Sequence, residues 1–210
     1  MRLMLALMLA CAIAASCAPN SGNVAVAEAS KSPGSGVGTA VPGFRCPPAG
    51  TRVGYSNGNT FEATGVDPAD PSTCRYRVTR PQGTTDELRY LGYWSAPPAP
   101  EVRNGFAKLF PMAIGKEAHF VRQDLDYARM AQQLDEAWRL VDRAPLEIAA
   151  KPRDAWIIER RISSPGFEEN ARVWIDVETF VPLRLVRTSI QGGVRGWAPP
   201  YAAISFELPQ

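Results

Sequence analysis

The stretch Ala171–Thr188, which reads ARVWIDVETFVPLRLVRT, decides the fold class. Apolar residues occupy every second position in each of its halves, so they fall on one face. This face comprises Val173, Ile175, Val177, Val181, Leu183 and Leu185. A period of two is typical of a β-strand with one buried side. Because only the residues ETF separate the two halves, the stretch predicts an antiparallel hairpin.

The remainder of the chain carries the same pattern in short pieces. The turn SNGN separates two short runs, and Asn-Gly favours a β-hairpin. Further strand-like runs follow at 74–80, 87–94, 114–122, 155–162 and 202–208. Nineteen prolines disfavour long helices, and one short helix is expected around Glu101–Phe110. We therefore predict a mainly β protein: an antiparallel meander forming a curved sheet or part-barrel with one or two short helices.

Three segments are predicted to interrupt the strands. Apolar residues at 127–141 recur at helical spacing, although the run from Trp138 to Ile148 also has strand character. We expect a short helix or an irregular segment at 125–139, followed by a strand. The stretch PQGTTD at 81–86 is interpreted as a turn, and SSPGFEEN at 163–170 as a loop.

The N-terminus reads MRLMLALMLACAIAASCAPN and is uncharged from Leu3 to Cys17. This run is shorter than the roughly 20 residues that span a bilayer, and it predicts a secretory signal at 1–16. Its end, AASC, resembles the lipobox of bacterial lipoproteins, although Ala14 replaces the usual Leu. The resemblance implies that Cys17 is lipidated, and Ala18 then favours the outer membrane. The alternative is cleavage at an A-x-A-like site, which would release a periplasmic protein.

The domain boundaries follow from composition. Residues 17–42 are predicted to be the lipidated N-terminus and a flexible tether, because they are rich in Gly, Ser, Ala and Pro and contain no aromatic residue. Residues 43–210 are predicted to form a single β-rich domain. Without Arg2 of the signal, 22 basic residues face 21 acidic ones, a net charge of about +1. This balance argues against a nucleic-acid partner.

Two cysteines remain once Cys11 is removed with the signal and Cys17 is assigned to lipidation. In an oxidising periplasm we expect a Cys46–Cys74 disulfide, with a buried thiol pair as the alternative. The preceding stretch GVDPADPSTC contains two aspartates, at 67 and 70. Calcium needs about six to eight oxygen ligands, whereas Asp-Pro pairs favour turns. We interpret this stretch as a rigid turn that belongs to the scaffold.

No sequence motif indicates catalysis, a metal or a cofactor. The chain lacks HExxH and CxxC, and its one histidine, His119, is predicted to be structural or exposed. Glu168 and Glu169 are interpreted as a solvated turn. The loop GGVRGWAPPY is a candidate partner-binding site through Arg195, Trp197 and Tyr201. The alternative is that Trp197 plugs the end of the sheet.

Three segments carry a resemblance over roughly residues 109–188. They read LFPMAIGKEAHF, WRLVDRAPLEIAAKPRDAWIIERR and ARVWIDVETFVPLRLVRT. They resemble uncharacterised β-rich bacterial envelope lipoproteins, and the last hairpin is also similar to the half-barrels of periplasmic lipoprotein carriers. The resemblance favours strands at 125–141, and the chain departs from it at 151–154, where a Gly-containing turn is expected.

These observations together predict a non-catalytic envelope lipoprotein that faces the periplasm and acts as a binding or structural module. Its expected partners are the membrane, through the N-terminal lipid, and an envelope protein or an apolar ligand. Two alternatives remain open. One is a periplasmic carrier of a lipid or other apolar ligand, and the other is a carboxylate-dependent hydrolase.

Overall fold

The computed structural model describes residues 39–125, 131–192 and 200–210. The chain divides into two units, 1–34 and 35–210, and the second contains every described residue. Its strands are β1 Arg52–Tyr55, β2 Thr60–Asp67, β3 Asp70–Arg80, β4 Gly83–Tyr90, β5 Trp94–Ser95, β6 Glu117–Leu125, β7 Ala131–Ile148, β8 Lys151–Ser164, β9 Phe167–Asp176, β10 Pro182–Gly192 and β11 Tyr201–Glu207. A helix, α1 (Pro100–Phe106), continues into the 3-10 turn η1 (Ala107–Leu109).

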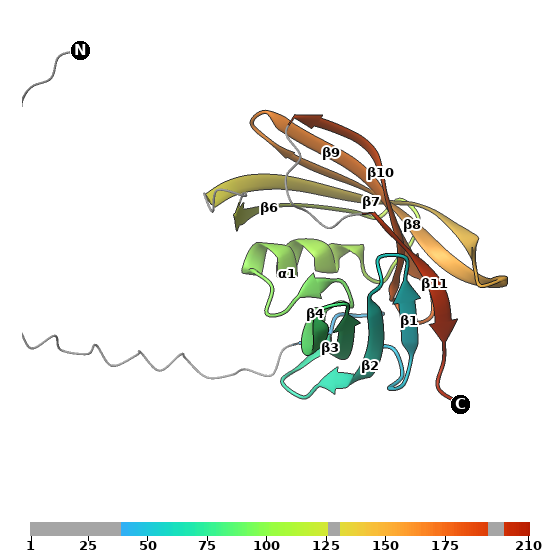
Figure 1. Cartoon of the computed structure of the whole chain (residues 1–210). Helices are drawn as coiled ribbons and strands as arrows, with labels where there is room; N and C mark the ends of the chain where they lie inside the picture. Colours follow the sequence, from blue (N-terminus) through green and yellow to red (C-terminus); the bar gives the residue numbers. More distant parts are fainter. Residues whose placement is uncertain (1–38, 126–130, 193–199) are drawn as a thin grey trace, which may run out of the picture. The chain divides into compact units, whose positions relative to one another are not determined.

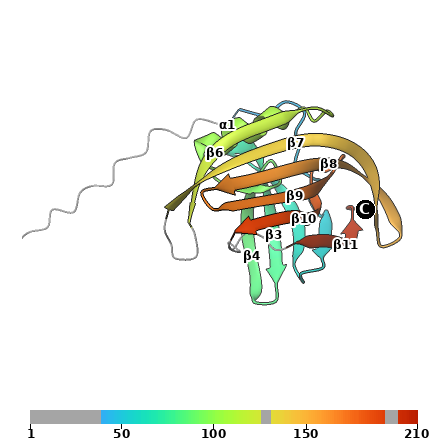
Figure 2. The same cartoon turned by 90° about the horizontal axis from the view of Figure 1, so that it is seen from above.

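The strands form one antiparallel sheet in the order β5-β4-β3-β2-β1-β11-β10-β9-β8-β7-β6 (Figure 1). The sheet consists of two meanders, β1–β5 and β6–β11, that meet where β1 pairs with β11. Figure 2 shows how strongly β7 and β8 bend along their length. Register shifts interrupt the pairing in both meanders, and such bulges bend and twist strands. The predicted curved antiparallel meander is confirmed.

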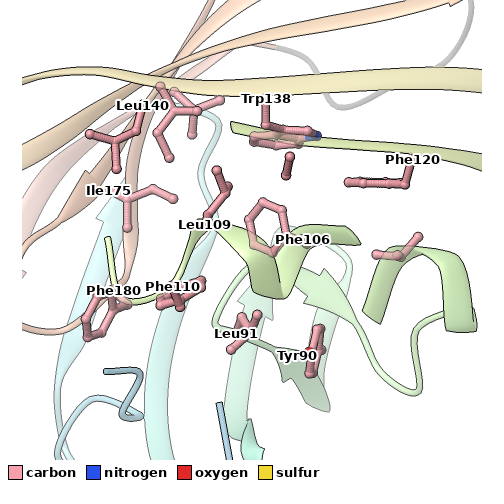
Figure 3. Close-up of a cluster of buried hydrophobic side chains, with 14 of the residues drawn as sticks. Tyr90, Leu91, Phe106, Leu109, Phe110, Phe120, Trp138, Leu140, Ile175 and Phe180 are labelled. Carbon is pink, nitrogen blue, oxygen red and sulfur yellow. The ribbon is translucent and has the colours of Figure 1, made fainter. Parts of the chain in front are cut away.

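The segment α1–η1 joins β5 to β6, which are the two edges of the sheet. Its apolar side chains pack inside the curve, where the ring of Phe106 lies 5.0 Å from that of Trp138 on β7 (Figure 3). The two edges also approach each other there, because Trp94 on β5 lies 5.9 Å from Phe120 on β6. A side chain at Gly105 would collide with Phe120, so glycine permits this close packing.

The helix or irregular segment predicted at 125–139 is wrong over the described part of that range. Residues 131–139 belong to β7, and residues 126–130 lie outside the described residues. From 134 to 140 every second side chain of the strand is buried: Leu134, Glu136, Trp138 and Leu140. Helical spacing of the apolar residues would place Glu136 on the polar side, whereas the strand buries its carboxylate. A charged residue at a buried position interrupts the alternation of apolar and polar residues, so the period of two that is typical of a strand is hidden in the sequence.

Three other boundaries also differ from the prediction. The turns at 81–82 and 165–166 are only two residues long, so most of PQGTTD and SSPGFEEN belongs to strands. The run at 87–94 does not continue as one strand. It ends at Tyr90 and turns back through Leu91, which has φ 49°, into the short β5.

The turn predicted for GVDPADPSTC is present only at Pro68 and Ala69, which connect β2 to β3, whereas the other residues of the stretch belong to these two strands. Cys74 is joined to Cys46 by a disulfide with the Cα atoms 5.4 Å apart, which confirms that pairing. The carboxylate of Asp70 accepts hydrogen bonds from the Ser72 N–H (3.0 Å), the Thr73 hydroxyl (3.0 Å) and Arg103 of α1 (2.6 Å). Burial opposes ionisation of Asp70, but these donors hold its pKa below the usual value. Asp70 therefore attaches α1 to the sheet.

Candidate functional site

A cleft of about 400 Å³ lies between the two meanders. Its volume falls within the range of small-molecule sites. The first meander contributes aromatic rings and two arginines, and the second contributes two more arginines and a carboxylate. The main lining residues are Tyr55, Phe61, Tyr76, Arg80, Arg89, Tyr93, Trp94, Arg122, Glu136, Arg160, Ile162 and Tyr201.

Strand register explains how charged side chains of the second meander come to face inward. One buried row crosses the sheet from Phe120 through Glu136 and Ile162 to Glu169. The neighbouring buried row runs from Ala118 through Trp138 and Arg160 to Ala171. The other members of the two rows are apolar: Ala118, Phe120, Trp138, Ile162 and Ala171. The sheet therefore places two carboxylates and a guanidinium on a face that otherwise forms the core.

Aromatic side chains form one wall of the cleft. Tyr55 lies at the centre of this wall, with ring centroids 5.5 Å from Phe61 and 5.3 Å from Tyr201 in edge-to-face geometry. Phe61 in turn contacts Tyr76 at 6.0 Å. This wall offers flat apolar surface to an occupant of the cleft.

The tyrosines of the cleft remain neutral phenols. Burial raises the pKa of Tyr55, Tyr76, Tyr93 and Tyr201 above that of a free tyrosine. The hydroxyl of Tyr55 donates to the carbonyl oxygen of Pro182 at 2.7 Å. The phenols therefore bring hydroxyl groups to the cleft but no negative charge.

The second meander contains a buried network of ions. Glu136 accepts a hydrogen bond from Arg122 Nε at 2.5 Å and another from Trp138 Nε1 at 2.9 Å. Glu169, which is 1% exposed, accepts from Arg160 and, at 2.7 Å, from Arg187 Nε. Burying ion pairs seldom adds net stability. Such a network next to a cleft is a feature of functional sites.

Tyr93 connects this network to the arginines of the first meander. Its hydroxyl accepts a hydrogen bond from Arg160 Nη1 at 3.2 Å, and its backbone carbonyl accepts one from Arg89 Nη1 at 3.4 Å. Arg89 and its neighbour Arg80 both pair with Glu87. Arg89 on β4 and Arg160 on β8 thus lie at opposite ends of one tyrosine.

Four buried donors of the cleft have no hydrogen-bond partner within the described part of the chain. They are Arg89 Nε, Arg160 Nε, Trp94 Nε1 and the hydroxyl of Tyr76. Burying a donor without an acceptor is costly, and such groups are rare in folded proteins. These four atoms are therefore the features of the cleft that most directly indicate a polar ligand.

The structure places the residues singled out in the sequence in different regions. Tyr201 lines the cleft, whereas Arg195, Trp197 and Cys17 lie outside the described residues. His119 is exposed on the outer face, with Nε2 2.8 Å from Asp135 Oδ1. The interpretation of Glu168 and Glu169 as one solvated turn is wrong for Glu169, since alternation along β9 turns the two carboxylates to opposite faces.

Sequence reasoning missed Arg89, Glu136 and Arg160. A signal for them existed, because Glu136 and Arg160 each occupy an inward position in a run of alternating apolar residues. A charge at such a position indicates a buried polar group. Nothing in the local sequence shows that these two strands face Arg89.

Neither a metal-ligand cluster nor a membrane-spanning helix is present among the described residues. No group of three or more His, Cys, Asp or Glu side chains is arranged to hold a metal ion in that part of the chain. The helices of the same part are too short and too polar to cross a membrane.

Comparison with known proteins adds one distant likeness. No protein-family model and no curated protein matches the sequence. Among solved structures, the hypothetical lipoprotein YmcC from Escherichia coli is similar, with a TM-score of 0.43 and 12% identity. The match covers 76% of this chain and 83% of that chain. This structural neighbour is a β-rich hypothetical lipoprotein, and the function of the present chain is argued from its own residues.

Proposed function

We propose that the chain is an envelope lipoprotein, tethered to the membrane through Cys17, whose β-rich body binds a small molecule in the cleft without transforming it. The observation that carries this proposal is the cleft of about 400 Å³ between the two meanders, walled by aromatic rings. Flat aromatic surface interrupted by a few polar groups is typical of ligand sites. The proposal includes the carrier of an apolar ligand as one form of this binding role.

The chemistry of the lining favours binding over hydrolysis. Among the described residues that line the cleft, Glu136 is the one carboxylate, and both of its oxygens accept hydrogen bonds. A carboxylate-dependent hydrolase needs two carboxyl groups at the substrate, one of them able to donate a proton. Glu136 has neither a second carboxylate beside it on the lining nor an uncommitted oxygen.

The tether and the location are argued from the N-terminus. The segment AASC at 14–17 supports lipidation, and the composition of 17–42 supports a flexible tether. The Cys46–Cys74 disulfide suits an oxidising compartment such as the periplasm. Ala18 favours an outer-membrane protein that faces the periplasm, with lipid chains as the anchor.

Metabolic labelling with a fatty acid tests the tether. We expect label on the wild type and on the control Cys11→Ala, because Cys11 belongs to the signal that is removed. We expect no label on Cys17→Ala, which also leaves the membrane fraction. Equal labelling of the Cys17 variant and the wild type would contradict the assignment.

Identification of bound small molecules tests the cleft. The full chain is purified in membrane discs that avoid detergent, and the molecules that it retains are identified by mass spectrometry. Ser95 is exposed at the cleft, so Ser95→Trp should fill the space and deplete the retained molecule about tenfold. Ser189→Trp, on an exposed strand position that does not line the cleft, should retain it. Equal retention by both variants, or no retained molecule in the wild type, would refute binding in the cleft.

A further inference from the structure

The charge and the donors of the cleft indicate which chemical class it takes. We propose that the cleft binds an oxyanion carried on an apolar body, with Arg89 and Arg160 at the anion and the aromatic wall against the body. The oxyanion is a carboxylate, phosphate or sulfate group. This inference rests on the proposed binding function and specifies its ligand.

The first support is the sign of the charge around the cleft. The ion pairs that the structure describes there join five arginines to four carboxylates. Glu87 is shared by Arg80 and Arg89, and Glu169 by Arg160 and Arg187. Because the phenols stay neutral, the described residues around the cleft carry a surplus of positive charge. An anion complements that surplus.

The second support is the set of donors without an acceptor. Arg160 is 7% exposed and Tyr76 is 3% exposed, and each has a buried donor atom for which the described residues supply no acceptor. Arg89 Nε and Trp94 Nε1 share this property. An ionised oxyanion is an acceptor only, with several lone pairs. It matches a group of unused donors, whereas a hydroxyl-rich ligand would bring donors of its own.

The third support is the position of the two arginines. Tyr93 accepts a hydrogen bond from Arg160 at its hydroxyl and one from Arg89 at its backbone carbonyl, and both arginines line the cleft. The aromatic residues Tyr55, Phe61 and Tyr201 line the same cleft and leave apolar surface for the rest of the ligand. Charged hydrogen bonds of this type are among the strongest in proteins.

The outer face of the sheet provides the contrast. There Glu117, Arg139, Glu159 and Arg172 lie side by side on β6 to β9 and alternate in sign. Arg139 and Arg172 both pair with Glu159. This row has equal numbers of each charge, so it offers no reason to select an anion. Arg139 therefore serves as the matched control.

The test compares probes that share one chain and differ in their head group. The full chain in discs of neutral lipid is titrated calorimetrically, with empty discs as the blank. The probes are dodecyl phosphate, dodecylphosphocholine, dodecyl maltoside and inorganic phosphate. We expect dodecyl phosphate to bind at least about tenfold more tightly than the uncharged dodecyl maltoside or the zwitterionic dodecylphosphocholine. One strong charged hydrogen bond implies a difference of this size. Inorganic phosphate should bind more weakly than dodecyl phosphate, because it lacks the apolar body.

The outcomes separate this inference from the function on which it rests. Equal affinity for the three dodecyl probes would overturn the anion preference and leave the binding function standing. Inorganic phosphate binding as tightly as dodecyl phosphate would overturn the role of the aromatic wall. Failure of every dodecyl probe to bind would refute both.

Variants localise the anion. Arg160→Gln would leave Glu169 with one arginine and risks misfolding, so Arg89→Gln is the primary variant. It should weaken dodecyl phosphate about tenfold and leave dodecyl maltoside unchanged. Tyr76→Phe and Trp94→Phe each remove one unused donor but keep a ring, and each should weaken the phosphate severalfold. Arg139→Gln should change nothing, and unchanged phosphate affinity in Arg89→Gln would overturn the assignment.

Discussion

Two neighbouring residues, Glu168 and Glu169, show how strand geometry separates identical side chains. Glu168 lies outward, where its carboxylate pairs with Arg161. Glu169 points inward and is shared by Arg160 and Arg187 in the buried network beside the cleft. One carboxylate is therefore in solvent, and the other holds two guanidinium groups in place.

Replacing each glutamate separately gives a prediction at Glu169 and its control at Glu168. Glu169→Gln leaves a buried guanidinium without its counter-charge and should lower the free energy of unfolding by about 3 kcal/mol. Glu168→Gln removes an exposed ion pair and should change it by less than about 1 kcal/mol. Urea denaturation of the two variants measures the difference. Equal effects would show that Glu169 does not neutralise the buried arginines.

At the scale of elements, the long β7–β8 hairpin turns through an unusual pair. Ala149 and Ala150 have φ 48° and 60°. Gly and sometimes Asn adopt this left-handed conformation readily, whereas other residues adopt it with difficulty. They join Ile148 to Lys151 in the ladder. The resemblance led us to expect a glycine-containing turn at 151–154. The structure instead places that segment within β8 and puts the turn just before it.

The turn predicts a stabilising change. Replacing Ala149-Ala150 by Asn-Gly, which suits two left-handed positions, should raise the free energy of unfolding by about 1–2 kcal/mol. Chemical denaturation measures the gain. Ala131→Gly, at an exposed strand position, is the control and should cost about 0.5–1 kcal/mol instead. A loss of stability in the Asn-Gly variant would contradict the left-handed turn.

On the scale of the whole molecule, long-range pairing brings the two meanders together. β1 pairs with β11, although about 150 residues separate them, and the disulfide fixes the segment before β1 to β3. The cleft exists because these contacts close one meander against the other. Its arginines come from both meanders, so ligand binding should stabilise the assembled body.

The disulfide should contribute to this assembly. Its cysteines are 28 residues apart, and closing a loop of that length contributes roughly 3–4 kcal/mol in the chain-entropy account. Cys46→Ser with Cys74→Ser should therefore lower Tm by about 6–16 °C. Thermal unfolding with and without a reductant checks this result. The wild type should respond to the reductant, whereas the double variant should not.

The sequence by itself determined the strands and most hairpins, because alternation and turn residues act between near neighbours. The hairpin at 171–188, the Asn-Gly turn and the Cys46–Cys74 pairing are all present in the structure. Only the tertiary structure decided that β1 meets β11, that Glu136 and Glu169 are buried, and that Arg89 faces Arg160 across Tyr93. Alternation along a strand can mark such a position as inward, but the burial of its carboxylate depends on arginines contributed by other strands.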